Sequence, residues 1–137
     1  MKLSKTSEYA LRILIFMAKE PSLLYTAKQL VKELNVSDKY LRRLMTDLSK
    51  SGFIRSVQGR DGGYTFTKSI NDILLYDIID SVEGMDKLNG CLLGFEKCSC
   101  TNPCAMHDNW QVVRTDLNKL FRETKLSNLN FDKIMRY

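Results

Sequence analysis

Residues 26–67 read TAKQLVKELNVSDKYLRRLMTDLSKSGFIRSVQGRDGGYTFT, and the first half of this stretch predicts two short helices. Thr26 and Gln29 match a capping box, Ser37 is a natural N-cap for the second helix, and Gly52 is well placed to end it. Two short helices joined by a tight turn fit a helix-turn-helix. The apolar side chains recur with a helical period, at positions 30, 31 and 34 and again at 41, 44, 45 and 48.

A β-hairpin is predicted in the second half of the stretch. Residues 53–57 (FIRSV) and 64–67 (YTFT) are rich in β-branched and aromatic side chains, which favour strands. Between them lies a glycine-rich turn, residues 58–63 (QGRDGG), which carries one arginine. A phosphate-cradling enzyme loop is disfavoured here, because the last glycine is not followed directly by the lysine and serine of a P-loop.

A further helix precedes these elements. Residues 8–19 carry apolar side chains with a helical period, and Ser4 or Thr6 can cap the helix that they form. Three helices followed by a two-stranded hairpin have the order of a winged helix. We therefore expect a mainly α fold with a small β-hairpin, in which residues 1–70 form a winged helix-turn-helix DNA-binding region.

The second half of the chain, residues 71–137, is expected to complete the same compact chain. It begins with a short helix over 74–82 that Gly84 ends, followed by a loop over about 85–107 that holds every cysteine. A long helix follows over about 104–124. Its apolar residues alternate spacings of four and three, which is the seam that two packed helices use, and we expect a dimerisation helix; packing back on its own domain is the alternative. The seam positions are 106, 110, 113, 117 and 120.

Charge is distributed unevenly along the chain. The formal net charge is +5, but residues 1–70 carry 13 Lys or Arg and 6 Asp or Glu, whereas residues 71–137 carry 8 and 10. The excess of basic residues in the first half suggests a polyanionic partner, most simply double-stranded DNA. A solvated basic surface is the alternative. The longest apolar run, residues 13–18, is far too short to span a membrane, and the start does not resemble a signal peptide. We expect a cytoplasmic protein with reduced thiols.

The candidate DNA contacts lie on the predicted helix-turn-helix and the hairpin turn. Recognition helices present their first turns to the major groove, where Arg and Lys bind guanine edges, and a hairpin tip can reach a minor groove. Ser37 is first of all a cap, one of the two arginines of the helix could be a phosphate anchor, and we expect Tyr40 to be exposed rather than part of the core. The candidates are Lys28, Ser37, Lys39, Tyr40, Arg42, Arg43, Gln58 and Arg60.

All four cysteines and the only histidine lie within residues 91–107. Thiolates and an imidazole this concentrated suit a soft metal or an iron–sulfur cluster. Cys104 and His107, three positions apart at the start of the predicted helix, should project from one face. Zinc is the alternative, although zinc fingers usually have two C-x2–4-C units and this chain has no such pair of units. An iron–sulfur or thiol enzyme is disfavoured, because the chain has no carboxylate pair and no nucleophile–base motif.

Several motifs along the chain together resemble those of one family, the winged-helix regulators that include the iron–sulfur cluster biogenesis regulator and the nitric-oxide-sensitive repressor (the Rrf2 family). The resemblance covers almost the whole chain. Its motifs are residues 3–10 (LSKTSEYA), 36–41 (VSDKYL), the turn 57–64, residues 77–79 with the Glu–Gly pair at 83–84, and finally three cysteines followed by a histidine.

The resemblance implies a homodimeric transcription regulator, most often a repressor, whose operator binding depends on a [2Fe–2S] or [4Fe–4S] cluster. It implies Cys91, Cys98 and Cys104 as cluster ligands, with Cys100 as an alternative ligand or a redox thiol. The fourth ligand is His107 or, from the partner chain, Glu8. Some members of the family sense through thiols or other ligands and lack a cluster. A cluster would be prone to loss in aerobic preparations.

Overall fold

The structure, a computed structural model, describes residues 3–97, 99–131 and 133. Its first helix, α1 (Lys5–Ala18), begins after Ser4, one of the two predicted caps, whose side chain accepts from the Ser7 backbone N–H at 3.1 Å. One face of α1 is fully buried and forms the centre of the molecule. The apolar residues of this face are Ala10, Ile13, Leu14, Met17 and Ala18.

The helix-turn-helix predicted from the caps is confirmed. α2 (Ala27–Leu34) begins with the reciprocal capping box of Thr26 and Gln29. Asn35 then takes a left-handed conformation (φ 56°), which reverses the chain between the helices. α3 (Asp38–Lys50) begins at its N-cap Ser37 and is followed by Gly52 at φ +85°.

The predicted hairpin is also confirmed, and it is joined to the segment between α1 and α2. β1 (Ile54–Val57) and β2 (Gly63–Phe66) pair antiparallel, with Ile54 opposite Phe66. Tyr25, just before α2, joins the sheet through two backbone bonds with Tyr64, 2.9 and 2.8 Å long. A β-carbon added to Gly63 would lie 2.6 Å from the Tyr25 carbonyl oxygen, so glycine permits this close approach.

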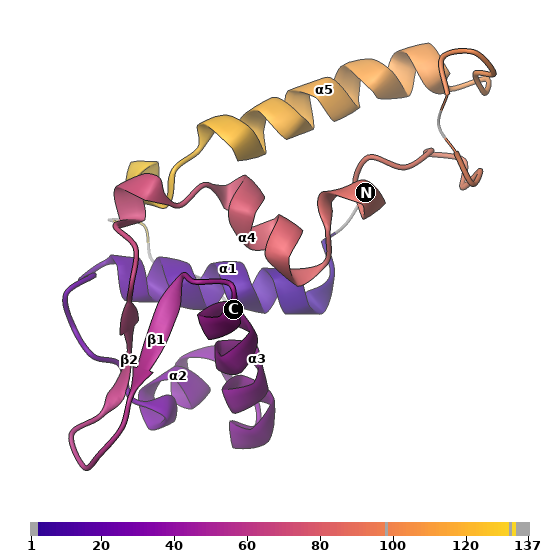
Figure 1. Cartoon of the computed structure of the whole chain (residues 1–137). Coiled ribbons are helices and arrows are strands. Elements are labelled where there is room, and N and C mark those ends of the chain that lie inside the picture. The colour runs from indigo at the N-terminus through magenta and orange to yellow at the C-terminus, as the bar shows by residue number, and fades with distance from the viewer. Residues whose placement is uncertain (1–2, 98, 132, 134–137) are drawn as a thin grey trace.

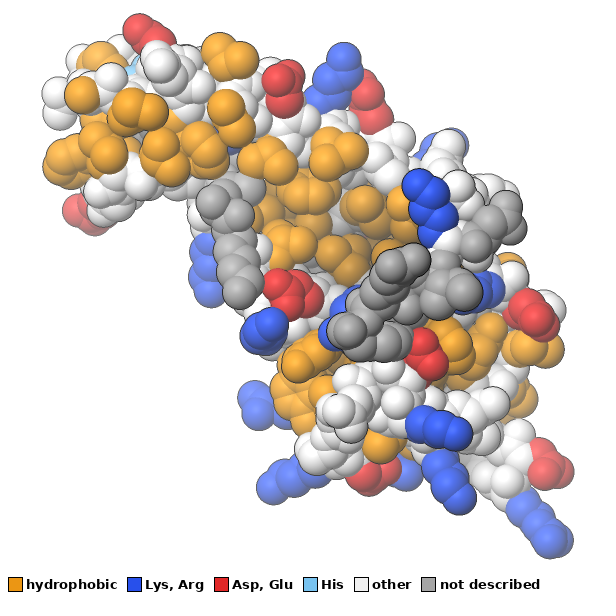
Figure 2. Space-filling view, turned by 180° about the vertical axis from the view of Figure 1, so that it is seen from behind, with side chains coloured by type: hydrophobic (Ala, Val, Ile, Leu, Met, Phe, Trp, Pro, Cys, Tyr) orange, Lys and Arg blue, Asp and Glu red, His pale blue; other side chains and the backbone are white. Residues whose placement is uncertain are grey.

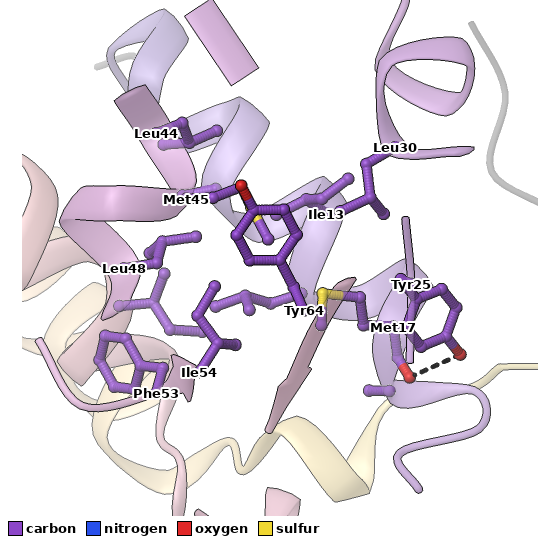
Figure 3. Packing of buried hydrophobic residues seen from close by; sticks show 14 of the residues in the cluster. Ile13, Met17, Tyr25, Leu30, Leu44, Met45, Leu48, Phe53, Ile54 and Tyr64 are labelled. Atoms are coloured by element: carbon purple, nitrogen blue, oxygen red, sulfur yellow. Dashed lines mark hydrogen bonds between the residues drawn. The ribbon is translucent and has the colours of Figure 1, made fainter. Parts of the chain in front are cut away.

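A single apolar core holds these elements together. In Figure 3, Ile13 and Met17 of α1 lie among side chains from α2, α3 and both strands. The same cluster includes Ile73, Ile78 and Leu126 from the second half of the chain, so the core continues past the winged helix. Every buried side chain of this kind contributes roughly 1.5–3 kcal/mol relative to exposure.

The second half lies over α1 and extends into an arm (Figure 1). α4 (Leu75–Val82) packs against α1. The carboxylate of Glu83, just after α4, accepts from the Ser7 hydroxyl at 2.8 Å and from the Ser4 backbone at 3.3 Å, which fixes the start of α1 to the end of α4. Short 3-10 turns connect the elements: Ile70–Asp72, Met85–Lys87 and Leu126–Asn128.

The long helix, α5 (His107–Glu123), runs along the top of the molecule in Figure 1, with the cysteine loop at its far end. It begins at His107 rather than near residue 104, because residues 105–106 form a turn, closed by a 3.1 Å bond from the His107 backbone N–H to the Cys104 carbonyl oxygen. The predicted seam is divided between two faces. Trp110 and Leu117 pack on the protein itself, whereas Val113 and Leu120 are 49% and 54% exposed.

Candidate functional site

The first turns of α3 present an exposed polar surface. Ser37 caps the helix by accepting from the Tyr40 backbone at 3.1 Å, and its residue remains exposed. Lys39 and Arg43 project into solvent, as does Arg42. The buried stripe of α3 (Leu41, Leu44, Met45 and Leu48) faces the core and leaves these cations on the outside. α3 therefore has the arrangement of a helix that can lie in a major groove.

Tyr40 is the exception on this surface. Its side chain is half-buried, so the expectation that it would be exposed is wrong in part. The ring packs edge-on against Tyr9 of α1 with centroids 5.7 Å apart, and its hydroxyl lies 3.3 Å from the Thr6 hydroxyl. Tyr40 thus joins α3 to α1, and its offset from the apolar stripe did not reveal this contact.

A cleft of about 890 Å³ lies between α3 and the hairpin. Arg42 and Gln58, two of the predicted contacts, line it from opposite sides. Lys50 at the end of α3 and Arg55 on β1 line it as well, and sequence reasoning missed both. The alternation of β1 places Arg55 on the face opposite the buried Ile54, which was a usable signal; only the packing of the hairpin on α3 places Lys50 here.

The remaining predicted DNA contacts lie around this cleft. Lys28 is exposed on the first turn of α2, and Arg60 is exposed at the hairpin tip. The glycines of the hairpin turn serve its own backbone: a β-carbon on Gly62 would lie 2.0 Å from the Val57 carbonyl oxygen. Glycine at position 62 is therefore required by the hairpin turn itself.

The cysteine loop brings two thiols together at the start of α5. The sulfur atoms of Cys91 and Cys104 lie 3.7 Å apart, and both side chains are half-buried. They line a pocket of about 470 Å³ together with His107 and Phe95. Cys100 is an exposed free thiol outside the described lining of this pocket, and Cys98 lies outside the described residues.

The loop backbone favours the thiolate of Cys91. Hydrogen bonding from the Phe95 backbone, with smaller contributions from Leu93, Cys104 and Gly94, holds the pKa of Cys91 below its ordinary value, while burial acts in the opposite direction. Thiolate is the form that binds metals and attacks oxidants. The lowered pKa of Cys91 therefore favours both metal binding and reaction with oxidants in this pocket.

The proposed fourth ligands differ in position. His107 is buried, lines the cysteine pocket, and donates its backbone N–H to the Cys104 carbonyl at 3.1 Å. Glu8 lies on the first turn of α1, pairs with Lys5 at 3.2 Å, and is not among the described residues that line the pocket. Within the described part of the chain, no three His, Cys, Asp or Glu residues converge closely enough to form a metal site.

A comparison with known protein families identifies the family that combines this winged helix with a cysteine loop. Residues 3–131 match the Rrf2 family, which is described as an iron-dependent transcriptional regulator. The chain belongs to the Rrf2 family. An HTH-type transcriptional regulator assigned in Aquifex aeolicus is 31% identical over 131 residues, which span 94% of this chain and 91% of the relative. Rrf2 membership makes the protein a DNA-binding transcriptional regulator rather than an enzyme, as the sequence predicted.

Solved structures of the family have the same fold. CymR, the global cysteine regulator of B. subtilis, aligns with a TM-score of 0.76 at 25% identity, over 93% of this chain and 95% of CymR. IscR of T. potens aligns with a TM-score of 0.73 at 21% identity, over 100% of this chain and 94% of IscR. The winged-helix fold predicted from the sequence is thereby confirmed. No helix in the described part of this Rrf2 chain has both the length and the apolar character needed to cross a bilayer.

Proposed function

We propose that this Rrf2 protein is a homodimeric transcription repressor whose operator binding is controlled by an iron–sulfur cluster in the cysteine loop. The observation that carries the proposal is the 3.7 Å separation of the Cys91 and Cys104 sulfur atoms in a pocket that also contains the buried His107. This sensor pocket lies at the first turn of α5, the helix whose apolar face is partly exposed.

The spacing of the two sulfurs suits a shared metal ion. Two thiolates on a tetrahedral metal with bonds of about 2.3 Å have sulfur atoms about 3.8 Å apart. The sulfurs of Cys91 and Cys104 are already 3.7 Å apart, so a metal could bind both without moving the backbone of the loop. The soft thiolate donors and the imidazole also match the ligands of an iron–sulfur centre.

The proposed ligands are Cys91, Cys98 and Cys104, with His107 as the fourth. Cys100 and Glu8 of the partner subunit are the alternatives. A bound cluster would supply redox chemistry and sensitivity to oxidants, nitric oxide and iron supply. The residues of this chain hold the loop closed over the start of α5, and the presence or absence of metal–thiolate bonds would change the order of that loop.

The dimer would form through α5. Exposed apolar side chains follow this helix and the cysteine loop, and apolar side chains extend along the arm in Figure 2. Burying them against a second copy would set the distance between the two α3 helices, which must be roughly 34 Å to enter successive major grooves on one face of DNA. The exposed apolar residues of this arm are Leu92, Leu93, Phe95, Val112, Val113 and Leu120.

The same two thiols support a second candidate function, a regulator that senses oxidants through its cysteines without a cluster. Cys91 and Cys104 are close enough to form a disulfide after a small rotation of their side chains, and the pKa of Cys91 is lowered. CymR, a structural relative, is named as a cysteine regulator. In this case the protein would contain no iron, and oxidation would replace metal binding as the signal.

Anaerobic purification with analysis of iron, acid-labile sulfide and zinc distinguishes these functions. Cluster control predicts a brown protein that contains iron and sulfide in equal amounts and whose operator affinity changes when the cluster is removed. A colourless protein that contains zinc or no metal, and that changes operator affinity only on thiol oxidation, would contradict the cluster and support the second candidate.

A further inference from the structure

Three side chains on one face of α5 hold the chain segment that leads into the cysteine loop. The Trp110 indole N–H donates to the Gly90 carbonyl oxygen at 2.8 Å. The Arg114 guanidinium donates to the Asn89 carbonyl oxygen at 2.8 Å, and the Asn118 amide donates to the Asn89 side-chain oxygen at 2.6 Å. These donors are spaced four residues apart and therefore lie on one face of the helix. We call Trp110, Arg114 and Asn118 the α5 ladder.

The segment is also held from the other side. The Asn89 amide donates to the Met85 carbonyl oxygen at 3.0 Å, as does the Asn89 backbone N–H. Met85 and Leu88 are buried in a small apolar cluster with Phe121 of α5. Asn89 therefore uses its backbone and both side-chain polar atoms, and the carbonyl groups at 89 and 90 have fixed directions.

The position of the ladder gives it a consequence for the thiols. Cys91 directly follows the anchored Gly90. The carbonyl oxygen of Cys104 accepts from the backbone N–H of His107, the first residue of α5. The loop that carries the cysteines is therefore held at both ends by α5. The ladder anchors its first residues, and the first turn of α5 follows directly after its last residues. We propose that the α5 ladder positions Cys91 opposite Cys104, and that Trp110 and Arg114 are positioning residues of the thiol pair.

The proposal does not depend on which species the pocket binds. It concerns the effective concentration of one thiol at the other, which anchoring of a loop end raises by reducing the conformations open to the loop. One hydrogen bond of this kind corresponds to about a three- to tenfold change in such an equilibrium.

The test is a thiol–disulfide equilibrium in the metal-free full-length chain. Cys98→Ser and Cys100→Ser leave only Cys91 and Cys104, and glutathione buffers then set the oxidation state. Each Cys91–Cys104 disulfide formed converts one oxidised glutathione into two reduced molecules, so the equilibrium constant is the effective thiol concentration. In this background we expect Trp110→Phe, which keeps an aromatic ring but removes the donor, to lower that constant about three- to tenfold.

Arg114→Met provides a second variant, because it keeps the aliphatic stem of a half-buried residue and removes the donor. Arg114→Met should lower the Cys91–Cys104 equilibrium constant by a similar factor. If Trp110→Phe does not fold, this variant alone tests whether the ladder positions Cys91. Thr115→Val is the matched control: it removes a 2.8 Å side-chain bond to the Gln111 carbonyl on α5 but no contact with the loop. The proposal is wrong if the two ladder variants leave the constant within twofold of the parent, or if Thr115→Val lowers it equally.

Discussion

Arg42 and Asp38 form an ion pair one turn apart on α3, with Nε and Oδ2 2.8 Å from each other and both side chains about 60% exposed (59% and 61%). The bond raises the pKa of Arg42 further, so the guanidinium is charged at every physiological pH. An exposed pair of this kind contributes little to stability. Asp38 therefore orients Arg42 over the cleft between α3 and the hairpin without holding it strongly.

Replacing Arg42 should weaken specific DNA binding. We expect Arg42→Ala to cost about 1–3 kcal/mol with the operator and to cost less with unrelated DNA, because a contact to a base edge discriminates among sequences. Electrophoretic mobility shifts or fluorescence anisotropy with both DNAs would measure it. Equal losses on all sequences would reduce Arg42 to a phosphate contact. The matched control is Lys119→Ala, an exposed cation on α5 that does not line the cleft.

A charge on the exposed face of α5 should separate the dimer. Val113 is 49% exposed in the single chain, and burying a glutamate there against a second copy would leave it without hydration. We expect Val113→Glu to raise the dimer dissociation constant at least about tenfold, as measured by sedimentation. Thr115→Glu, a nearby exposed position on another face of α5, should have no such effect; equal dissociation by both variants would contradict the assignment.

Substituting the cysteines tests the proposed ligands. Cys91→Ala, Cys98→Ala and Cys104→Ala should each abolish the visible absorption of anaerobically purified protein, because each removes one thiolate ligand. Cys100→Ala should leave the absorption in place. If Cys100→Ala alone removes the colour, the ligand assignment is wrong.

The fourth ligand requires a separate comparison. His107 lines the cysteine pocket of its own chain, whereas Glu8 does not line it and is proposed as a ligand from the partner subunit. We expect His107→Ala to shift the visible spectrum and Glu8→Ala to leave it unchanged. The opposite pattern would assign the partner's Glu8, and an unchanged spectrum in both variants would exclude both candidates.

The lowered pKa of Cys91 predicts a pH dependence of thiol reactivity. In metal-free protein with Cys98, Cys100 and Cys104 replaced by serine, the backbone of residues 93–95 still favours the thiolate. Because a lowered pKa maintains thiolate as the pH falls, half-maximal alkylation by iodoacetamide should occur at a lower pH in the folded protein than in the unfolded chain. A titration in urea supplies the unfolded reference; identical midpoints would contradict the prediction.

The approach of Tyr25 to the hairpin predicts an intolerant glycine. Gly63→Ala would place a methyl group 2.6 Å from the Tyr25 carbonyl oxygen and should lower the free energy of unfolding by about 2–3 kcal/mol. Gly90→Ala is a suitable control, since its nearest atom would be 3.7 Å away, an ordinary contact. Urea unfolding of both variants measures the difference, and equal losses would contradict the explanation.

The sequence by itself determined the helix-turn-helix and the hairpin. The capping box of Thr26 and Gln29 and the cap at Ser37 join groups three residues apart, so the residue types reveal them directly. The apolar periods likewise identified the buried stripe of α3. These features depend on neighbours along the chain, where local geometry leaves few alternatives.

Only the tertiary structure decided which distant groups meet. Cys91 and Cys104 approach across 13 positions, the indole of Trp110 reaches Gly90 across 20, and Ser7 binds Glu83 across 76. It also divided the α5 seam, because packing on α4 buries some of its apolar residues and leaves others exposed. No local period specifies such contacts, since they depend on how loops close and on which helix faces the shared core covers.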